Sequence, residues 1–196
     1  MNAQAVIDLL FPPQCAACDR VGTGLCHACF PLTSLQRPPG TRPFPVRMLG
    51  ACEGALRAAV LALKDGRRDV ARELAARLAL VVVPNAILAP VPTTAARKRD
   101  RGFDGMVLVG EWLARRGDCS LRSQLEHVRG DAQRGRGRTA RLAARGRFAW
   151  KGECLNGERI VLLDDVMTTG ATLSDCAATI ERAGGVVSEA IVIAVA

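Results

Sequence analysis

An unbroken apolar run followed at once by two carboxylates constrains this chain more than any other feature. Residues 160–163 read Ile-Val-Leu-Leu, and Asp164 and Asp165 come next. A run without alternation is typical of a strand buried on both faces, as in a parallel sheet covered by helices. The carboxyl end of such a strand is where open α/β sheets bind ligands. The two acidic side chains are therefore expected in a binding site.

The rest of the chain alternates strand and helix patterns around this run. Apolar strand patterns begin near residues 46, 86, 147 and 186, and helical periodicity covers residues 53–65, 67–83, 105–117 and 172–185. This alternation predicts an α/β fold with a mainly parallel sheet flanked by helices. Residues 121–129 fit neither pattern clearly.

The loop after the paired acids has the composition of a phosphate site. Its residues are Thr168, Thr169, Gly170, Ala171 and Thr172, and a predicted helix follows. Glycine lets backbone N–H groups close around an anion, the threonine hydroxyls add donors, and the positive end of the helix dipole points to the same place. The two preceding carboxylates face opposite sides of the strand and suit vicinal hydroxyls, directly or through Mg²⁺. Together these groups suit ribose 5-phosphate.

Other sites also place acidic residues after an apolar strand. A P-loop NTPase is excluded, because none of the three lysines, Lys64, Lys98 and Lys151, follows a glycine. A haloacid-dehalogenase motif needs D-x-D-x-T, whereas the two acids here are adjacent. An ordinary capped loop remains as the structural alternative, but it does not explain the Thr-Thr-Gly-Ala-Thr run.

Four of the eight cysteines lie close together near the N-terminus. They form two C-x2-C pairs, Cys15 with Cys18 and Cys26 with Cys29. Two such pairs can complete a tetrahedral shell of four thiolates, which suits Zn²⁺ and leaves no position open for water. We therefore expect a structural zinc site. A redox C-x2-C pair and a ligand set that has lost its metal are the alternatives.

Proline marks the expected domain boundary. Residues 31–45 contain five prolines, a composition typical of a linker or an extended strap. We therefore expect a short N-terminal helix and a four-cysteine module in residues 1–30, a linker over 31–45, and the α/β domain over 46–196.

The net charge of +8 is confined to one stretch of the chain. Residues 97–147 carry 14 basic and 6 acidic side chains, which accounts for the whole surplus of the 27 basic over the 19 acidic residues. A uniformly basic, histone-like protein is therefore excluded. No apolar run is long enough to span a membrane, and the N-terminus lacks the basic start of a signal peptide. These features predict a cytoplasmic protein.

The motifs and their order resemble a known family. Residues 160–172, IVLLDDVMTTGAT, look like the phosphoribosyl pyrophosphate (PRPP) signature of type I phosphoribosyltransferases. The two C-x2-C pairs, LALKDGRRDVARELA, PVP and RKRDRGFDG precede the signature in the order found in the ComF family. The resemblance covers nearly the whole chain. It implies a type I phosphoribosyltransferase-like domain, a zinc unit and, in some members, a link to DNA uptake in competence.

The resemblance also implies roles for individual residues. Asp164 and Asp165 would contact the ribose hydroxyls of PRPP as catalytic residues, and residues 168–172 would hold its 5-phosphate. The turn formed by Lys64, Asp65, Gly66 and Arg67 would bind pyrophosphate, with Mg²⁺ as its partner. A flexible basic loop with Arg97, Lys98, Arg99 and Arg101 would fold over the substrate.

The chain departs from the family pattern in two places. After Arg-Gly-Phe, Asp104 and Gly105 stand where the family usually has Asn-Gln, which adds a negative charge beside an anion site. Residues 134–147 are rich in arginine and glycine, and Arg134, Arg136 and Arg138 could contact the backbone of single-stranded DNA. The alternatives for this segment are an ordinary basic surface and a contact with pyrophosphate.

These features predict transfer of ribose 5-phosphate from PRPP to a nitrogen nucleophile with loss of pyrophosphate. The alternative is a non-catalytic adaptor that binds zinc, PRPP and single-stranded DNA during DNA uptake, together with competence proteins. No residue of the sequence stands out as a general base for the acceptor.

Overall fold

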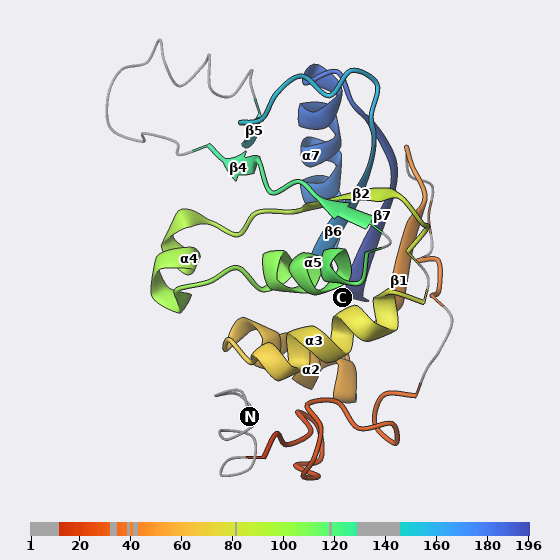
Figure 1. Ribbon diagram of the computed structural model, residues 1–196, viewed down its shortest axis with the longest axis vertical. Helices are drawn as coiled ribbons and strands as arrows, with labels where there is room; N and C mark the ends of the chain where they lie inside the picture. Colours follow the sequence, from red (N-terminus) through yellow and green to blue (C-terminus); the bar gives the residue numbers. More distant parts are fainter. Residues whose placement is uncertain are drawn as a thin grey trace.

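Five parallel strands form the centre of the molecule (Figure 1). The computed structural model describes residues 12–31, 35–38, 40, 43–80, 82–117, 119–128 and 146–196. The sheet contains β1 (Val46–Ala51), β2 (Ala86–Pro90), β3 (Cys119–Leu121), β6 (Arg159–Met167) and β7 (Val186–Val195). Their order across the sheet is β1-β7-β6-β2-β3, and all four neighbouring pairs are parallel. The predicted α/β class with a mainly parallel sheet is confirmed.

Helices cover both faces of this sheet. One side has α2 (Gly54–Lys64), α3 (Arg68–Leu78) and α5 (Gly105–Arg115), and the other side has α7 (Ala171–Arg182) (Figure 1). Because side chains alternate along a strand, Val161 and Leu163 of β6 pack with the first group, and Ile160 and Leu162 pack with α7. The apolar run is therefore buried on both faces, as its composition predicts.

Two small elements lie beside the sheet. The strands β4 (Leu125–His127) and β5 (Phe148–Trp150) pair antiparallel, and Phe148 and Leu125 are buried in the core on the α7 side. The helix α4 (Ala95–Arg101) connects β2 to α5 and has no buried residue. The sequence predicts a loop where α4 forms, and it leaves the segment that contains β4 undecided.

The four-cysteine segment packs directly on the α/β domain. Cys15, Leu25, Cys26 and Phe30 are buried in the same hydrophobic core as residues of α2, α3 and α5. In Figure 1 this segment runs beside α2 and α3. The helix expected before it and the arginine-rich segment at 134–147, apart from Gly146 and Arg147, lie outside the described residues. Among the residues that are described, no helix is long and apolar enough to cross a membrane.

Candidate functional site

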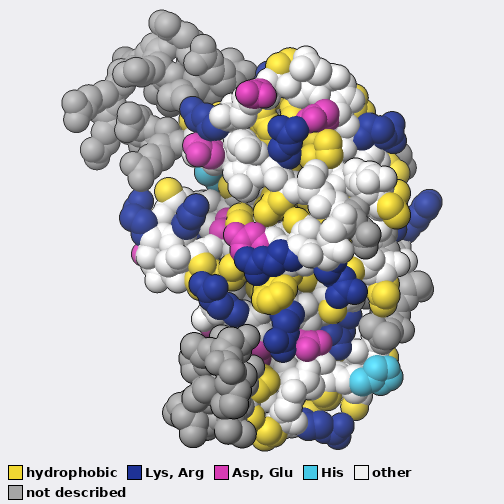
Figure 2. Space-filling model, viewed as in Figure 1, with side chains coloured by type: hydrophobic (Ala, Val, Ile, Leu, Met, Phe, Trp, Pro, Cys, Tyr) yellow, Lys and Arg dark blue, Asp and Glu magenta, His cyan; other side chains and the backbone are white. Residues whose placement is uncertain are grey.

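A cavity of about 310 Å³ opens at the carboxyl ends of β2 and β6. Parallel strands end at the same edge of a sheet, so side chains from distant segments converge there. The cavity is lined by Leu63, Lys64, Val91, Pro92, Thr93, Thr94, Arg97, Arg101, Asp104, Gly105, Met106, His127, Arg147, Phe148, Asp164, Asp165, Val166 and Thr172. On the face shown in Figure 2, dark-blue basic side chains lie beside magenta acidic ones near the middle of the molecule.

The paired acids both line this cavity but face different layers. Asp165 lies toward α2, where its carboxylate is 2.9 Å from the Nζ of Lys64. Asp164 lies on the α7 side and is 9% exposed. Each carboxylate also accepts a backbone N–H, Asp164 from residue 165 and Asp165 from Val166. The pair therefore presents fixed carboxylate oxygens at the end of a buried strand.

The environment of Asp164 favours its neutral form. Burial raises the pKa of this carboxyl from 3.8 to about 8, and the nearby charge of Asp165 acts in the same direction. The charge of Lys64 opposes the shift but contributes least. The thiol of Cys176 on α7 has a raised pKa, because this thiol is buried and lies near the carboxyl groups of Asp164 and Asp175. A cation bound beside Asp164 would favour its carboxylate form.

The threonine loop leads into the N-terminus of α7 as predicted. Gly170 is the residue before the helix and has a φ of +83°, a left-handed conformation that favours glycine. The Oγ1 of Thr169 accepts a hydrogen bond from the N–H of Ala171 at 3.3 Å. Of the predicted phosphate-binding residues, Thr172 lines the cavity. Thr168 and Thr169 are exposed in the loop that follows β6.

The residues of the predicted pyrophosphate turn point to two places, the cavity and the cysteine segment. Lys64 lines the cavity, and Asp65 is an exposed residue that ends α2. Gly66 has a φ of +88°, and a Cβ there would lie 2.7 Å from the ring of Phe103, so both the turn and the packing require glycine. Arg67 is turned away from the cavity: its guanidinium pairs with Asp69 and donates to the carbonyl of Gln14. The structure therefore brings Lys64, and not Arg67, to the carboxylates.

The basic residues of the predicted flexible loop lie on α4. Arg97 and Arg101 line the cavity, Lys98 lines a neighbouring cavity, and Arg99 lines neither. Thr94 begins the helix, because its hydroxyl accepts the N–H of Arg97 at 3.4 Å. None of these four basic side chains has an ion pair with a described residue. Two cations are therefore left to neutralise an anion in the cavity.

Asp104 has a structural role that its sequence context does not indicate. One carboxylate oxygen accepts the N–H groups of Met106 and Val107 at the start of α5, and the other accepts the N–H of Thr93 at 3.1 Å. At Gly105 a Cβ would lie 2.9 Å from Leu63 of α2, so the small residue allows close packing. Asp104 and Gly105, which together form the first departure from the family pattern, thus both support the wall of the cavity.

The structure adds residues that the sequence analysis missed. Thr93 and His127 line the cavity, and the ring of His127 lies 4.7 Å from that of Phe148. Arg147, the last residue of the arginine-rich segment, also lines the cavity, and its side chain pairs with Asp175. Hydroxyl residues directly after the strand AILAPVP were the available signal for Thr93. No local pattern indicates His127, because it reaches the site only through the pairing of β4 with β5.

A second cavity of about 490 Å³ adjoins the first. The two share Pro92, Thr93, Asp104 and His127. The second cavity continues between α4 and the β4–β5 pair, where Lys98, Glu126 and Lys151 contribute charged groups. A molecule in the second cavity would therefore lie against one in the first.

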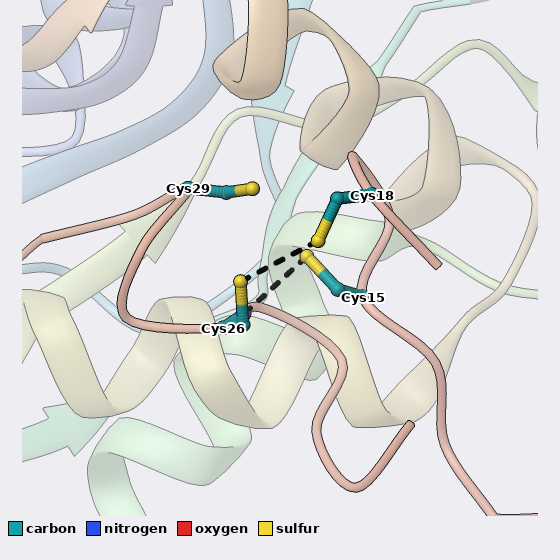
Figure 3. A group of neighbouring side chains, drawn as sticks. All are labelled: Cys15, Cys18, Cys26 and Cys29. Atoms are coloured by element: carbon teal, nitrogen blue, oxygen red, sulfur yellow. Dashed lines mark hydrogen bonds between the residues drawn. The ribbon is translucent and has the colours of Figure 1, made fainter. Parts of the chain in front are cut away.

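The four cysteines form one compact cluster (Figure 3). Their sulfur atoms all lie within 4.8 Å of one another and point toward a common centre. The Sγ atoms of Cys18 and Cys26 are 3.7 Å apart, which matches the edge of about 3.8 Å of a tetrahedron with Zn–S bonds of about 2.3 Å. The donor set and its size therefore fit a four-thiolate metal site.

Backbone hydrogen bonds favour thiolates in this cluster. Burial acts to raise the pKa of Cys15, but hydrogen bonds from the N–H groups of Cys26, Ala17 and Cys18 outweigh it and lower this pKa to about 6. Hydrogen bonds also lower the pKa of Cys26. Hydrogen bonding to Cys18 and Cys26 raises the pKa of Cys29 to about 12. The surroundings of Cys15 and Cys26 therefore favour the thiolate form more than those of Cys29 do.

Comparison with known proteins agrees with the resemblance seen in the motifs. No protein-family model matches the chain. Competence protein ComFC of Bacillus subtilis (strain 168) is 33% identical over 87 residues, which are 44% of this chain and 35% of that protein. This part of the chain is therefore similar in sequence to ComFC. The chain spans about a third of the length of ComFC. The match therefore does not show that this protein has the activity or the partners of ComFC.

A solved structure gives a weaker likeness. The adenine phosphoribosyltransferase of Thermoanaerobacter pseudethanolicus ATCC 33223 is 16% identical and covers 81% of each chain, with a TM-score of 0.36. The assignment of the fold therefore rests on the strand order of this sheet, its flanking helices and the cysteine cluster. These features show an α/β domain with a mainly parallel sheet and a four-cysteine cluster that could hold a metal ion.

Proposed function

We propose that this protein binds PRPP and transfers its ribose 5-phosphate to a nitrogen nucleophile, releasing pyrophosphate. The observation that carries the proposal is the carboxylate pair of Asp164 and Asp165 beside Lys64, in a cavity that also contains Arg97 and Arg101. Acidic groups for ribose hydroxyls and unpaired cations for phosphates are brought together there. The signature in residues 160–172 supports the same substrate.

Each part of PRPP has a counterpart in this arrangement. The 5-phosphate would bind at the N-terminus of α7, where Gly170 shapes the loop and Thr172 lines the cavity. The ribose hydroxyls would bind Asp164 and Asp165. The pyrophosphate would lie between Lys64 and the arginines of α4, which neutralise its charge as it leaves.

Two metal ions belong to this proposal. The carboxylates of Asp164 and Asp165 are ligand types that Mg²⁺ prefers, and Mg²⁺ bound there with pyrophosphate would neutralise the leaving group. Zn²⁺ is the proposed ion of the cluster of Cys15, Cys18, Cys26 and Cys29, where a closed shell of four thiolates would be structural.

The reaction needs positioning more than a strong base. The bond between the anomeric carbon and the pyrophosphate oxygen breaks, a bond from nitrogen to that carbon forms, and the nitrogen loses a proton. The second cavity would hold the acceptor against the ribose. His127 lines both cavities, so we assign to it the role of accepting this proton. The bound groups would exclude water from the reacting carbon.

Calorimetry with PRPP and Mg²⁺ tests the binding step. Wild-type protein should bind PRPP, and Asp164→Asn with Asp165→Asn should weaken binding by about a hundredfold, since two hydrogen-bonding carboxylates are lost. Glu111→Gln is the matched control, because Glu111 is a partly exposed carboxylate on α5 that pairs with Arg115 and lines neither cavity. Absence of binding to the wild type would overturn the proposal.

Pyrophosphate release separates an enzyme from a binding protein. Incubation of PRPP with a panel of nucleobases and ammonia should release pyrophosphate above the level of the double variant. Binding without release would favour the adaptor that acts on single-stranded DNA with competence proteins. Arg134, Arg136 and Arg138, the residues proposed for DNA contact, lie outside the described residues. The cytoplasmic location and the three-part division at residues 30 and 45 stay predictions.

A further inference from the structure

The cysteine cluster and the cavity lie at opposite ends of a short chain segment. Lys64 reaches the cavity from the end of α2, and Arg67 reaches the cysteine segment from the residue before α3. The turn between them is held by two backbone hydrogen bonds, from Gly66 to Leu63 at 3.2 Å and from Arg67 to Ala62 at 3.1 Å. Arg67 and Lys64 are therefore joined by a hydrogen-bonded turn.

Arg67 holds the first C-x2-C pair. Its Nη2 donates to the carbonyl of Gln14, the residue before Cys15, and to the carboxylate of Asp69. Its Nε donates to the other oxygen of Asp69 at 3.3 Å, so the guanidinium is held in one plane. Asp69 also lies against the backbone of the cysteine segment, because a Cβ at Gly24 would be 2.7 Å from its Oδ2.

Arg77 holds the second C-x2-C pair from the other end of α3. Its Nη2 donates to the carbonyls of Leu25 at 2.9 Å and Phe30 at 3.2 Å. These residues flank Cys26 and Cys29, one on each side. The guanidinium also lies 5.8 Å from the centre of the Phe30 ring and pairs with Glu73. Both ligand pairs are thus tied to a single helix.

The turn has little freedom to adjust independently. Gly66 is packed against Phe103, which follows α4, and the side chain of Lys64 is paired with Asp165. Movement of Arg67 would therefore change the position of Lys64 relative to the carboxylates, and would also disturb the contact with the segment that joins α4 to α5.

We propose that the metal-bound cysteine cluster positions the Lys64 turn through Arg67, so that the cluster and the anion site are energetically coupled. Metal binding fixes the backbone at Gln14 and Cys15, this backbone fixes Arg67, and Arg67 fixes the turn. The identity of the anion as PRPP rests on the proposed function, but the coupling to the turn does not. Because such coupling is reciprocal, an anion bound at Lys64 would raise the affinity of the cluster for its metal by the same factor.

Amide hydrogen exchange measured by NMR on the full chain tests the coupling without a substrate. Removal of zinc from the wild type with a chelator should speed exchange of the Gly66 and Arg67 amides by about tenfold, as the turn loses a charge-assisted anchor. Arg67→Gln with zinc bound should show the same fast exchange. Arg72→Gln makes the same change at an exposed position of α3 and should leave the turn unchanged.

Binding measurements then separate positioning from general destabilisation. With zinc content confirmed as one per chain, Arg67→Gln should bind PRPP about tenfold more weakly than Arg72→Gln. Arg67→Lys keeps a charged donor for the Gln14 carbonyl and should recover part of the loss. In the wild type, PRPP should increase the affinity for zinc in a chelator competition, and Arg67→Gln should abolish this increase.

The possible failures are distinguishable. Unchanged exchange at Gly66 and Arg67 after zinc removal overturns the coupling, whether or not PRPP binds. Equal behaviour of Arg67→Gln and Arg72→Gln at full zinc content also overturns it. If the zinc-loaded wild type does not bind PRPP, the proposed function fails, and the exchange comparison alone decides the coupling.

Discussion

Asp164 is a buried acid whose charge is unfavourable in the folded protein. Its pKa is raised from 3.8 to about 8, mainly by burial, so between these pH values the folded chain retains a proton that the unfolded chain loses. The neutral carboxyl is tolerated in the folded protein, so Asp164 causes no loss of stability below about pH 4. As the pH rises from about 4 to about 8, the unfolded chain ionises more readily than the folded one, and the free energy of unfolding decreases. The residue that suits a cation or a hydroxyl group therefore lowers the stability of the free protein at alkaline pH.

Replacing Asp164 by asparagine should remove this pH dependence. At pH 9 we expect Asp164→Asn to unfold at a temperature at least about 3 °C above the wild type, and the difference should disappear near pH 4. Thermal unfolding followed by circular dichroism across this range measures the effect. Glu111→Gln serves as the control and should show no such trend. A variant less stable than the wild type at pH 9 would contradict the pKa of about 8.

Asp104 illustrates how a residue can depart from a motif for a structural reason. Both of its carboxylate oxygens accept backbone N–H groups, one at the start of α5 and the other from Thr93. Asparagine offers only one acceptor, so Asp104→Asn would leave the Thr93 N–H or the helix start without a partner. The carboxylate that adds a negative charge near the cavity thus also links the segment after β2 to the start of α5.

The unfolding free energy should rank wild type above Asp104→Asn, and Asp104→Asn above Asp104→Ala. We expect losses of about 1 kcal/mol for asparagine and about 2 kcal/mol for alanine, because alanine removes the helix cap as well. Urea denaturation measures both values. Asp100→Asn, an exposed carboxylate on α4, should be neutral. If asparagine is as stable as aspartate, the Thr93 hydrogen bond has no energetic role.

At the scale of elements, α4 brings cations to the cavity from outside the core. Arg97 and Arg101 line the cavity, while Arg99 on the same helix does not. We expect Arg97→Gln combined with Arg101→Gln to weaken PRPP binding by about tenfold or more, and Arg99→Gln to have little effect. Titrations at low and high salt should show a smaller salt dependence for the double variant. An equal loss in Arg99→Gln would indicate a general effect of charge.

The elements that the sequence predicts are those with long apolar patterns. The strand at 159–167, the helices α2, α3, α5 and α7, and the last strand all form near their expected positions. The helix α4 was missed because its residues, AARKRDR, have no apolar face and none is buried. The strands β3 and β4 were also missed, because their three residues each, CSL and LEH, mix apolar and polar side chains. The equally short β5, FAW, is wholly apolar and was expected.

The cavity-lining residues that the sequence indicated belong mostly to continuous local segments of the chain. Asp164, Asp165 and Thr172 line the cavity together with Lys64 and two of the predicted basic residues. The side chain of Arg67 is directed elsewhere by Asp69 and Gln14, and His127 enters through strand pairing. Both depend on segments distant in sequence, and no local pattern in a single sequence shows such contacts.

At the scale of the whole molecule, the sheet separates two cores, and the cysteine cluster belongs to one of them. Cys15 and Cys26 are buried with Ala71 and Leu74 of α3, while the core on the other face is built on α7. The strands β6 and β7 contribute side chains to both cores, so loosening one core is expected to lower the stability of the other. Metal bound to the cluster should therefore stabilise the complete fold.

Removal of the metal should lower the unfolding temperature of the whole chain. We expect a decrease of about 5 °C or more on adding a chelator, because ligand binding to the folded state contributes directly to folding free energy. Cys15→Ser should reproduce the decrease and bind no metal, whereas Cys154→Ser makes the same exchange at an exposed position outside the cluster and should be neutral. Differential scanning calorimetry should show one transition that shifts as a unit. A separate low-temperature transition would instead show that the cluster unfolds without the α2–α3 core, although Cys15 and Cys26 share that core.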